Sequence, residues 1–344
     1  MTANVVDLVL PGLFDAALSG TASPPPTPAL EKLLARARPH AEPCRAWEWN
    51  LLSRFGIHCP DSGADAPFAA LALYGRYMDP GSAFWLQADP VHLYADRDQL
   101  VLFDAGHHRI SEAESDELVT LFNRHFADRG WHLLAPDPQH WYLGAPRRLS
   151  VQTHALDQAR GYGIHPFQPK GEDAGTLRRL LTEVEMLFHQ APANQARETR
   201  GEPRINGLWL SGGGVLPEAK SPLVTRVAGD ISEPLVLGAA RLSGAVAVEG
   251  REGIAADGHQ VIFSRGLLDA RSAGDSVAHA QYLRDWDRRL DSWYRPLSSG
   301  KLSEIRVSGG QVYRYDLGRR DLRRWWRRSR PLGHYGRLES PAQA

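Results

Sequence analysis

The chain has 344 residues, 42% of them hydrophobic and 23% charged, so it can bury a core and is not globally disordered. Its 40 basic and 40 acidic side chains cancel, which removes overall attraction to nucleic acid or anionic lipid and leaves only local patches. No apolar run approaches the ~20 residues of a membrane-spanning helix, and two cysteines make neither a disulfide framework nor a cysteine-built zinc site.

The N-terminal part of the chain predicts a strand followed by two helices. Residues 5–10 are apolar apart from Asp7 and include three β-branched valines, as in a buried parallel strand. A helix should begin after the cap Thr27, with Pro28 as its first residue, and a second helix should cover residues 46–55.

The pattern changes between residues 83 and 150, where two strands, a helix and two further strands are expected. Ser111 should cap that helix, Glu114 should complete a capping box, and Gly130 should end it. This order is typical of a small α+β lobe inserted into a larger core.

The remaining sequence predicts further elements in turn. A helix should cover residues 175–200, and a strand over 205–210 should run into a glycine turn at 212–214. A hairpin should turn at 309–310, and a final helix should cover the Arg-rich residues 319–330.

One stretch resembles a known family. Residues 188–214 are similar to a segment of the archaeal-type cofactor-independent phosphoglycerate mutases, which belong to the alkaline phosphatase superfamily. The matching positions are His189, Asn194, Arg197, Gly201, Asn206, Trp209, Gly212 and Gly214. Residues 27–37 and 102–122 resemble the same family more weakly. The whole pattern, with its terminal Arg and Trp residues, looks most like the proteobacterial RpfE-type regulatory protein family, a degenerate relative of these mutases.

The resemblance implies an α/β fold in two parts. Residues 1–82 and 151–338 would form an alkaline-phosphatase-like core with a mostly parallel sheet, and residues 83–150 the inserted α+β lobe. Residues 339–344 would be a disordered tail.

Catalysis in that superfamily uses two divalent metals held by Asp and His, with a Ser nucleophile between them. The resemblance puts the first metal-binding Asp directly after strand one, where this chain has Leu10, while the second, Asp15, remains. A gapless count back from Gly56 puts Trp47 near the Ser position, and the late Asp-His-Thr motif is absent. We therefore expect no metal or other cofactor; the alternative is a manganese or zinc site.

Weak catalytic candidates remain in Asp15, Asp275 and His279. Asp275 and His279 are four residues apart, so on a helix they would share a face and could ligate one metal. The alternative, which we favour, is that Asp275 caps the helix and His279 is exposed.

A second set consists of ligand-binding candidates from the family-like stretch. Its members are Asn194, Arg197, Arg204, Asn206, Trp209 and Gly213. The glycine run could bind a phosphate through backbone N–H groups, but it lacks the Lys-Ser/Thr of a P-loop. Structural roles are the favoured reading: a turn, core packing by Trp209, and polar side chains that brace the helix end and the loop.

The Arg-rich end supplies candidates for a partner or nucleic-acid patch. They are Arg320, Arg323, Arg324, Trp325, Trp326, Arg327 and Arg328. Guanidinium groups bind phosphate or carboxylate, and Trp stacks on bases or buries at a protein partner. Because the net charge is zero, the favoured alternative is that Leu322 and one Trp pack on the core while the arginines cover a solvated face.

Together these features predict a catalytically silent regulatory or interaction protein. One alternative is an active metal-dependent phosphoglycerate mutase or phosphatase with a rebuilt site; another is a nucleic-acid-associated protein that uses the C-terminal helix. We expect a protein partner at that helix and no membrane partner. Because the N-terminus lacks the basic start of a secretion signal, we also expect a cytoplasmic location.

Overall fold

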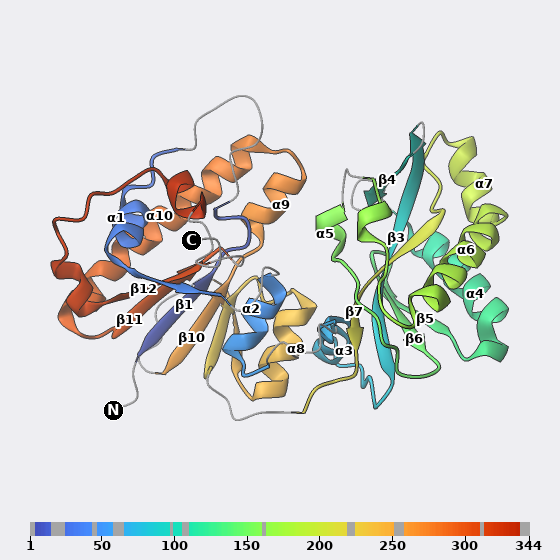
Figure 1. The fold of residues 1–344 in the computed structure, drawn as a ribbon, viewed down its shortest axis with the longest axis horizontal. Helices are drawn as coiled ribbons and strands as arrows, with labels where there is room; N and C mark the ends of the chain where they lie inside the picture. Colours follow the sequence, from blue (N-terminus) through green and yellow to red (C-terminus); the bar gives the residue numbers. More distant parts are fainter. Residues whose placement is uncertain are drawn as a thin grey trace. The chain divides into compact units, whose positions relative to one another are not determined.

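The chain forms two compact units in this computed structural model (Figure 1). The structure describes residues 4–14, 25–42, 47–57, 65–96, 99–104, 110–159, 163–218, 224–250, 258–309 and 313–337. The first unit comprises Met1–Cys59 and Glu218–Ala344, and the second comprises Pro60–Pro217. The inserted unit is thus wider than the 83–150 expected from sequence. Asp15 and the expected tail, 339–344, lie outside the described residues.

The first unit contains a seven-stranded sheet in the order β2-β12-β11-β1-β10-β8-β9. Its strands are β1 (Val5–Val9), β2 (Arg38–Ala41), β8 (Arg226–Gly229), β9 (Val246–Glu249), β10 (His259–Phe263), β11 (Glu304–Ser308) and β12 (Tyr313–Gly318). The five strands from β11 to β9 are parallel, while β12 and β2 are antiparallel additions. The mostly parallel sheet expected from sequence is confirmed.

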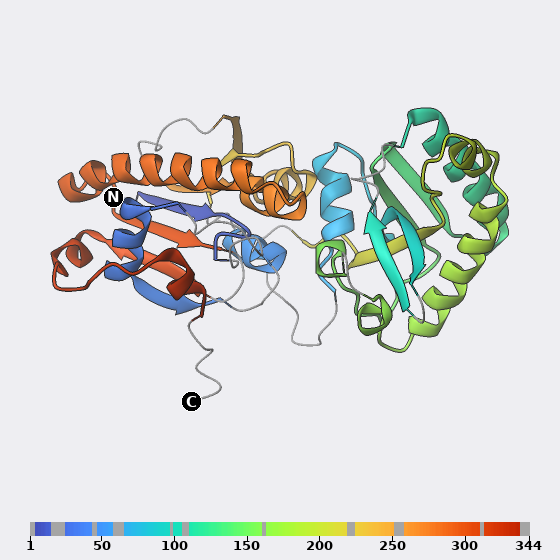
Figure 2. The same cartoon turned by 90° about the horizontal axis from the view of Figure 1, so that it is seen from above.

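The helices of this unit are α1 (Pro28–Arg36), α2 (Trp47–Arg54), α8 (Pro234–Ser243), α9 (Gly266–Ser272) and α10 (Ser276–Ser299). Side chains alternate between the faces of a strand. Val6 and Leu8 of β1 therefore enter the core formed with α1, α9 and α10, which includes Trp286, while Asp7 points to the opposite face. Figure 2 shows α10 running alongside this sheet.

The second unit contains a separate antiparallel sheet in the order β4-β3-β6-β5, with β7 also paired to β3. Its strands are β3 (Phe84–Asp96), β4 (Gln99–Asp104), β5 (His132–Asp137), β6 (His140–Ala145) and β7 (Gly207–Gly214). Its helices are α3 (Phe68–Gly75), α4 (Glu112–Phe126), α5 (Leu156–Ala159), α6 (Ala174–His189) and α7 (Pro192–Thr199). The unit extends beyond residues 83–150 because α3, α6 and β7 all pack within it.

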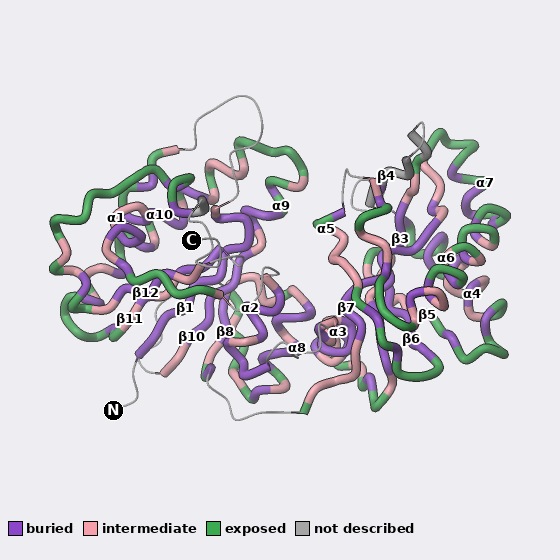
Figure 3. Tube along the Cα trace, in the orientation of Figure 1, coloured by how far each residue is buried: buried purple, intermediate pink, exposed green. Residues whose placement is uncertain are grey.

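The expected strand–strand–helix–strand–strand order is confirmed as β3, β4, α4, β5 and β6. Ser111 and Glu114 form the expected capping box at the start of α4. Apolar side chains of α4 and α6, among them Phe122 and Phe188, pack around the buried Trp141 of β6. Figure 3 shows buried strands and exposed outer turns of these helices.

The prediction of one helix over 175–200 is wrong in one respect, because this stretch forms two helices, α6 and α7. Pro192 begins α7; a proline cannot continue a helix, since it lacks the backbone N–H and clashes with the preceding turn. The glycine run 212–214 belongs to β7 and is not a turn.

Within the described part of the chain, no helix is long and apolar enough to cross a bilayer.

Candidate functional site

Open parallel sheets bind ligands at the carboxyl ends of their strands. At that edge of the first unit, β1 is followed by the buried Leu10 and β10 by Ser264. Trp47, the first residue of α2, stacks on Phe263 with ring centroids 5.2 Å apart and an interplanar angle of 29°. The guanidinium of Arg265 lies 5.6 Å from the centroid of the Trp47 ring. A guanidinium over the Trp47 ring, and the stack of that ring on Phe263, thus occupy part of this edge.

The carboxylates at the same edge have protein partners. Asp230, which follows β8, accepts hydrogen bonds from the Ser264 hydroxyl at 3.0 Å and from the Arg265 backbone N–H at 2.8 Å. Arg265 also pairs with Glu233 at 3.1 Å and with Asp269 at 3.3 Å. Nowhere in the described ranges do three or more His, Cys, Asp or Glu side chains come together to hold a metal ion. The described donors therefore do not fit a two-metal centre.

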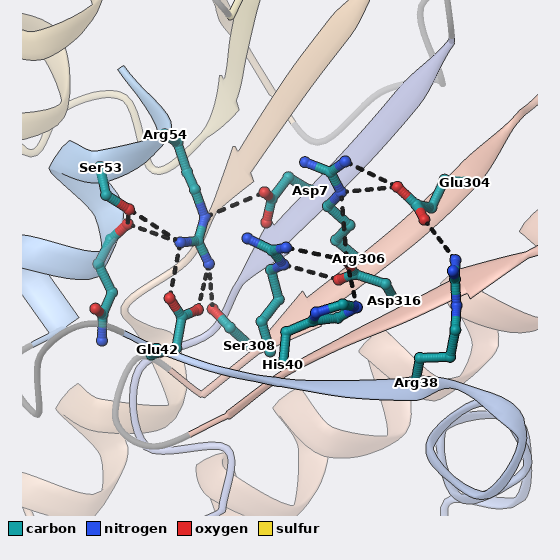
Figure 4. Close-up of polar contacts among 12 residues, drawn as sticks. Asp7, Arg38, His40, Glu42, Ser53, Arg54, Glu304, Arg306, Ser308 and Asp316 are labelled. Atoms are coloured by element: carbon teal, nitrogen blue, oxygen red, sulfur yellow. Dashed lines mark hydrogen bonds and ion pairs between the residues drawn. The ribbon is translucent and has the colours of Figure 1, made fainter. Parts of the chain in front are cut away.

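A network of buried charges lies on the sheet face opposite α10 (Figure 4). Asp7 has no exposed surface, and its Oδ2 lies 3.1 Å from Nε of Arg54, a residue of α2. Arg54 also donates from Nη1 to Glu42 at 2.9 Å, and its Nη2 lies 3.5 Å from the Ser308 hydroxyl. One guanidinium thereby connects α2 to β1, to β11 and to the segment after β2.

Burial by itself would raise the pKa of Asp7, but Arg54 and His259 outweigh it and lower the pKa to about 2. Burial likewise acts to lower the pKa of Arg54, and the carboxylates of Asp7 and Glu42 outweigh it and raise that pKa. Both groups are therefore charged at neutral pH. The cluster is an ion pair that holds α2 against the sheet.

The charges continue across the sheet in register. Asp7, Arg306, Asp316 and Arg38 are successive partners on β1, β11, β12 and β2, and their charges alternate in sign. Arg306 pairs with Glu304 at 2.8 Å, and Arg38 pairs with the same carboxylate at 3.1 Å. Opposite charges on adjacent strands stabilise a sheet. The signal in the sequence was a lone carboxylate in an apolar strand, which requires a buried cation as partner.

Asp275 and His279 are found at the start of α10. Asp275 is the N-cap: its Oδ1 accepts hydrogen bonds from the backbone N–H groups of Val277 at 3.1 Å and Ala278 at 2.9 Å. His279 is half-buried and not exposed. Its burial lowers the pKa of the imidazole, and the positive charge of Arg271 lowers it further. This geometry agrees with the helix-cap reading of Asp275.

Asn194 and Asn206 each bind backbone groups through both the nitrogen and the oxygen of the side-chain amide. Asn194 has no exposed surface; its Nδ2 donates to the carbonyls of Phe188 and Ile205 at 2.8 Å each, and its Oδ1 accepts from the Ile205 N–H at 2.7 Å. Asn206 donates to the Leu93 carbonyl at 2.8 Å and accepts from its N–H at 2.7 Å, which extends the pairing of β7 with β3. Both amides brace the path from α6 to β7.

The two arginines of this set also have internal partners. Arg197 is buried and donates to the Pro203 carbonyl at 2.7 Å and to Glu114 at 3.1 Å. Arg204 contacts Nδ1 of His189 at 2.9 Å and pairs with Glu198. The structure thus uses the charge of these side chains to fix α7 and the segment before β7.

Trp209 and Gly213 lie on β7. The Trp209 indole N–H donates to the His154 carbonyl at 2.8 Å, and the ring also lines a pocket of about 210 Å³ bounded by Phe167 and Arg178. The Gly213 N–H donates to Asp65, a carboxylate that sequence reasoning missed. A Cβ on Gly213 would lie 3.0 Å from the Phe84 ring, so this glycine allows β7 to pack closely on β3.

The Arg-rich residues 319–330, here called the Arg/Trp segment, do not form the expected helix. Only Arg319–Arg323 is helical, as the short 3₁₀ helix η4. Like charges at helical spacing disfavour a longer helix. The expectation that Trp325 or Trp326 packs on the core is also wrong: the two side chains are 77% and 63% exposed, while Leu322 does pack on the core.

With the fold and these sites described, the chain can be compared with known proteins. No family model matches it, and no curated protein matches its sequence. Among solved structures, the PH0037 protein from Pyrococcus horikoshii is similar with a TM-score of 0.56 and 15% identity, over 92% of this chain and 88% of that one. A cofactor-independent phosphoglycerate mutase from Thermoplasma acidophilum aligns over 99% of this chain and 96% of its own, with a TM-score of 0.44 and 15% identity. The likeness to PH0037 establishes a shared fold.

Proposed function

We propose that this chain is a non-catalytic relative of the cofactor-independent phosphoglycerate mutases, a cytoplasmic regulatory or interaction protein of the RpfE type. The observation that carries the proposal is the stack of Trp47 on Phe263 at the carboxyl edge of the parallel sheet. A gapless count back from Gly56 puts Trp47 near the position that the resemblance assigns to the nucleophilic Ser. An indole has no ionisable hydroxyl, so it cannot attack a phosphoryl group.

The charges at this edge support the same proposal. A dinuclear centre needs several anionic ligands that are free to neutralise two dications. Asp230 is engaged by Ser264 and the Arg265 N–H, and Arg265 itself brings a positive charge to the edge. Divalent metals would meet a guanidinium and an aromatic stack here.

With manganese, zinc, cobalt or magnesium, purified protein should not interconvert 2- and 3-phosphoglycerate above background. It should not hydrolyse p-nitrophenyl phosphate above background either. The matched variants are Asp15→Asn, Asp230→Asn and Asp275→Asn, each of which removes one candidate carboxylate. Turnover by the wild type that is lost in one of the variants would reject the proposal in favour of an enzyme with a rebuilt site.

A further inference from the structure

The Arg/Trp segment is an exposed aromatic and cationic surface that is independent of the sheet edge. The Trp325 and Trp326 rings are 6.2 Å apart at their centroids and nearly perpendicular, at 82°. Large apolar side chains exposed to this degree mark interaction sites more often than ordinary surface. Their position between arginines joins an apolar surface to positive charge.

The segment is held in place by two of its arginines. Arg324 donates to the carbonyl of Arg36 at 3.1 Å and pairs with Asp321 at 3.1 Å, while Arg327 donates to the carbonyls of Ala35 at 3.5 Å and Ala37 at 3.4 Å. These carbonyls belong to the C-terminal end of α1, where helix carbonyls lack intrahelical partners. The tryptophans are therefore presented from a fixed backbone.

Other arginines of the segment face solvent. Arg319, Arg320, Arg323 and Arg328 are exposed, and no acidic side chain within the described ranges pairs with them. From 319 to 330 there is one acidic residue, Asp321, against seven arginines. A net-neutral protein thus carries a concentrated positive patch whose complement is a polyanion.

We propose that the Arg/Trp segment binds single-stranded nucleic acid, with bases stacked on Trp325 and Trp326 and phosphates bound by the exposed arginines. Cations precede and follow the tryptophan pair along the chain, so phosphates on either side of a stacked base can be neutralised. An anionic membrane fits less well, because interfacial binding uses a broad apolar helix face. In the Arg/Trp segment the large exposed apolar side chains are those of Trp325 and Trp326, and both residues lie in a turn.

The test is fluorescence anisotropy of a labelled oligothymidylate of about 20 nucleotides, titrated with the full chain at about 50 mM and about 200 mM salt. Wild-type protein should bind, and more weakly at the higher salt. The double variant W325A/W326A should bind about tenfold more weakly, because base–aromatic stacking is lost. R320Q/R323Q should bind more weakly and lower the slope of log K against log salt by about 1.4, since each lost single-strand phosphate contact accounts for about 0.7.

The matched control is R148Q/R179Q, which removes the same charge from two exposed arginines of the second unit and should bind as the wild type does. Melting curves of all variants establish that each is folded. Failure of wild-type protein to bind at the lower salt overturns the proposal, as does unchanged affinity in W325A/W326A. Co-sedimentation with phosphatidylglycerol vesicles in the absence of oligonucleotide binding would assign the surface to a membrane instead. None of these outcomes bears on whether the protein is catalytic.

Discussion

Replacing Arg54 by Met should lower the free energy of unfolding by about 4 kcal/mol, because it leaves two buried carboxylates without their cation. Asp7 and Glu42 both pair with this guanidinium, and their side chains are 0% and 2% exposed. Urea denaturation followed by tryptophan fluorescence measures the change. Arg288→Met is the control: Arg288 pairs with Asp285 on α10 but is 74% exposed, so its loss should cost less than about 1 kcal/mol. Similar losses in the two variants would contradict the role assigned to the network.

The pH dependence of stability checks the same ion pair. The pKa of Asp7 falls on folding, so its contribution is present above the unfolded value of 3.8 and is lost as pH falls through about 2. Asp7→Asn should therefore be less stable than the wild type at neutral pH, and the difference should shrink between about pH 4 and about pH 2. A difference that stays constant with pH would show that the carboxylate is not held in its ionised form.

Asn194→Ala should destabilise the second unit by about 3 kcal/mol, since it leaves buried backbone groups of Phe188 and Ile205 without partners. Asn206→Ala is the matched control, because its amide also binds backbone on both sides, at Leu93. Asn206 is only partly buried, so water can replace the lost bonds and the cost should be about 1 kcal/mol.

Hydrogen exchange locates the effect of Asn194. The Ile205 backbone N–H donates to the Asn194 side chain. The Ile205 N–H should therefore exchange faster in Asn194→Ala than in the wild type or in Asn206→Ala. Equal costs for the two variants, with unchanged exchange at Ile205, would mean that Asn194 does not brace the path from α6 to β7.

The features that sequence reasoning predicted well are local ones. The Ser111–Glu114 capping box lies within one helical turn, and the apolar strand at residues 5–10 carries its own signal in β-branched side chains. The hairpin of β11 and β12 joins neighbouring segments. Each of these depends on residues close together in the chain, so no knowledge of tertiary structure was required.

What could not be predicted depends on contacts between distant segments. Asp7 and Arg54 come from a strand and a helix that only folding brings together, and β7 joins the second unit because it pairs with β3. The Arg/Trp segment does not continue as a helix, because its arginines repel one another at helical spacing and because Arg324 and Arg327 bind the end of α1. The contacts with α1, like those of Asp7 and of β7, join segments that are distant in the sequence.

The stack of Trp47 on Phe263 is the central feature of the proposed loss of catalysis, and metal content tests it most directly. Purified protein should be incubated with excess Mn²⁺, which prefers oxygen ligands, then desalted and analysed by inductively coupled plasma mass spectrometry. We expect well under one ion per chain. A dinuclear centre would retain about two ions per chain. Retention at that level, if it is lost in Asp15→Asn or Asp230→Asn, would contradict the proposed loss of catalysis.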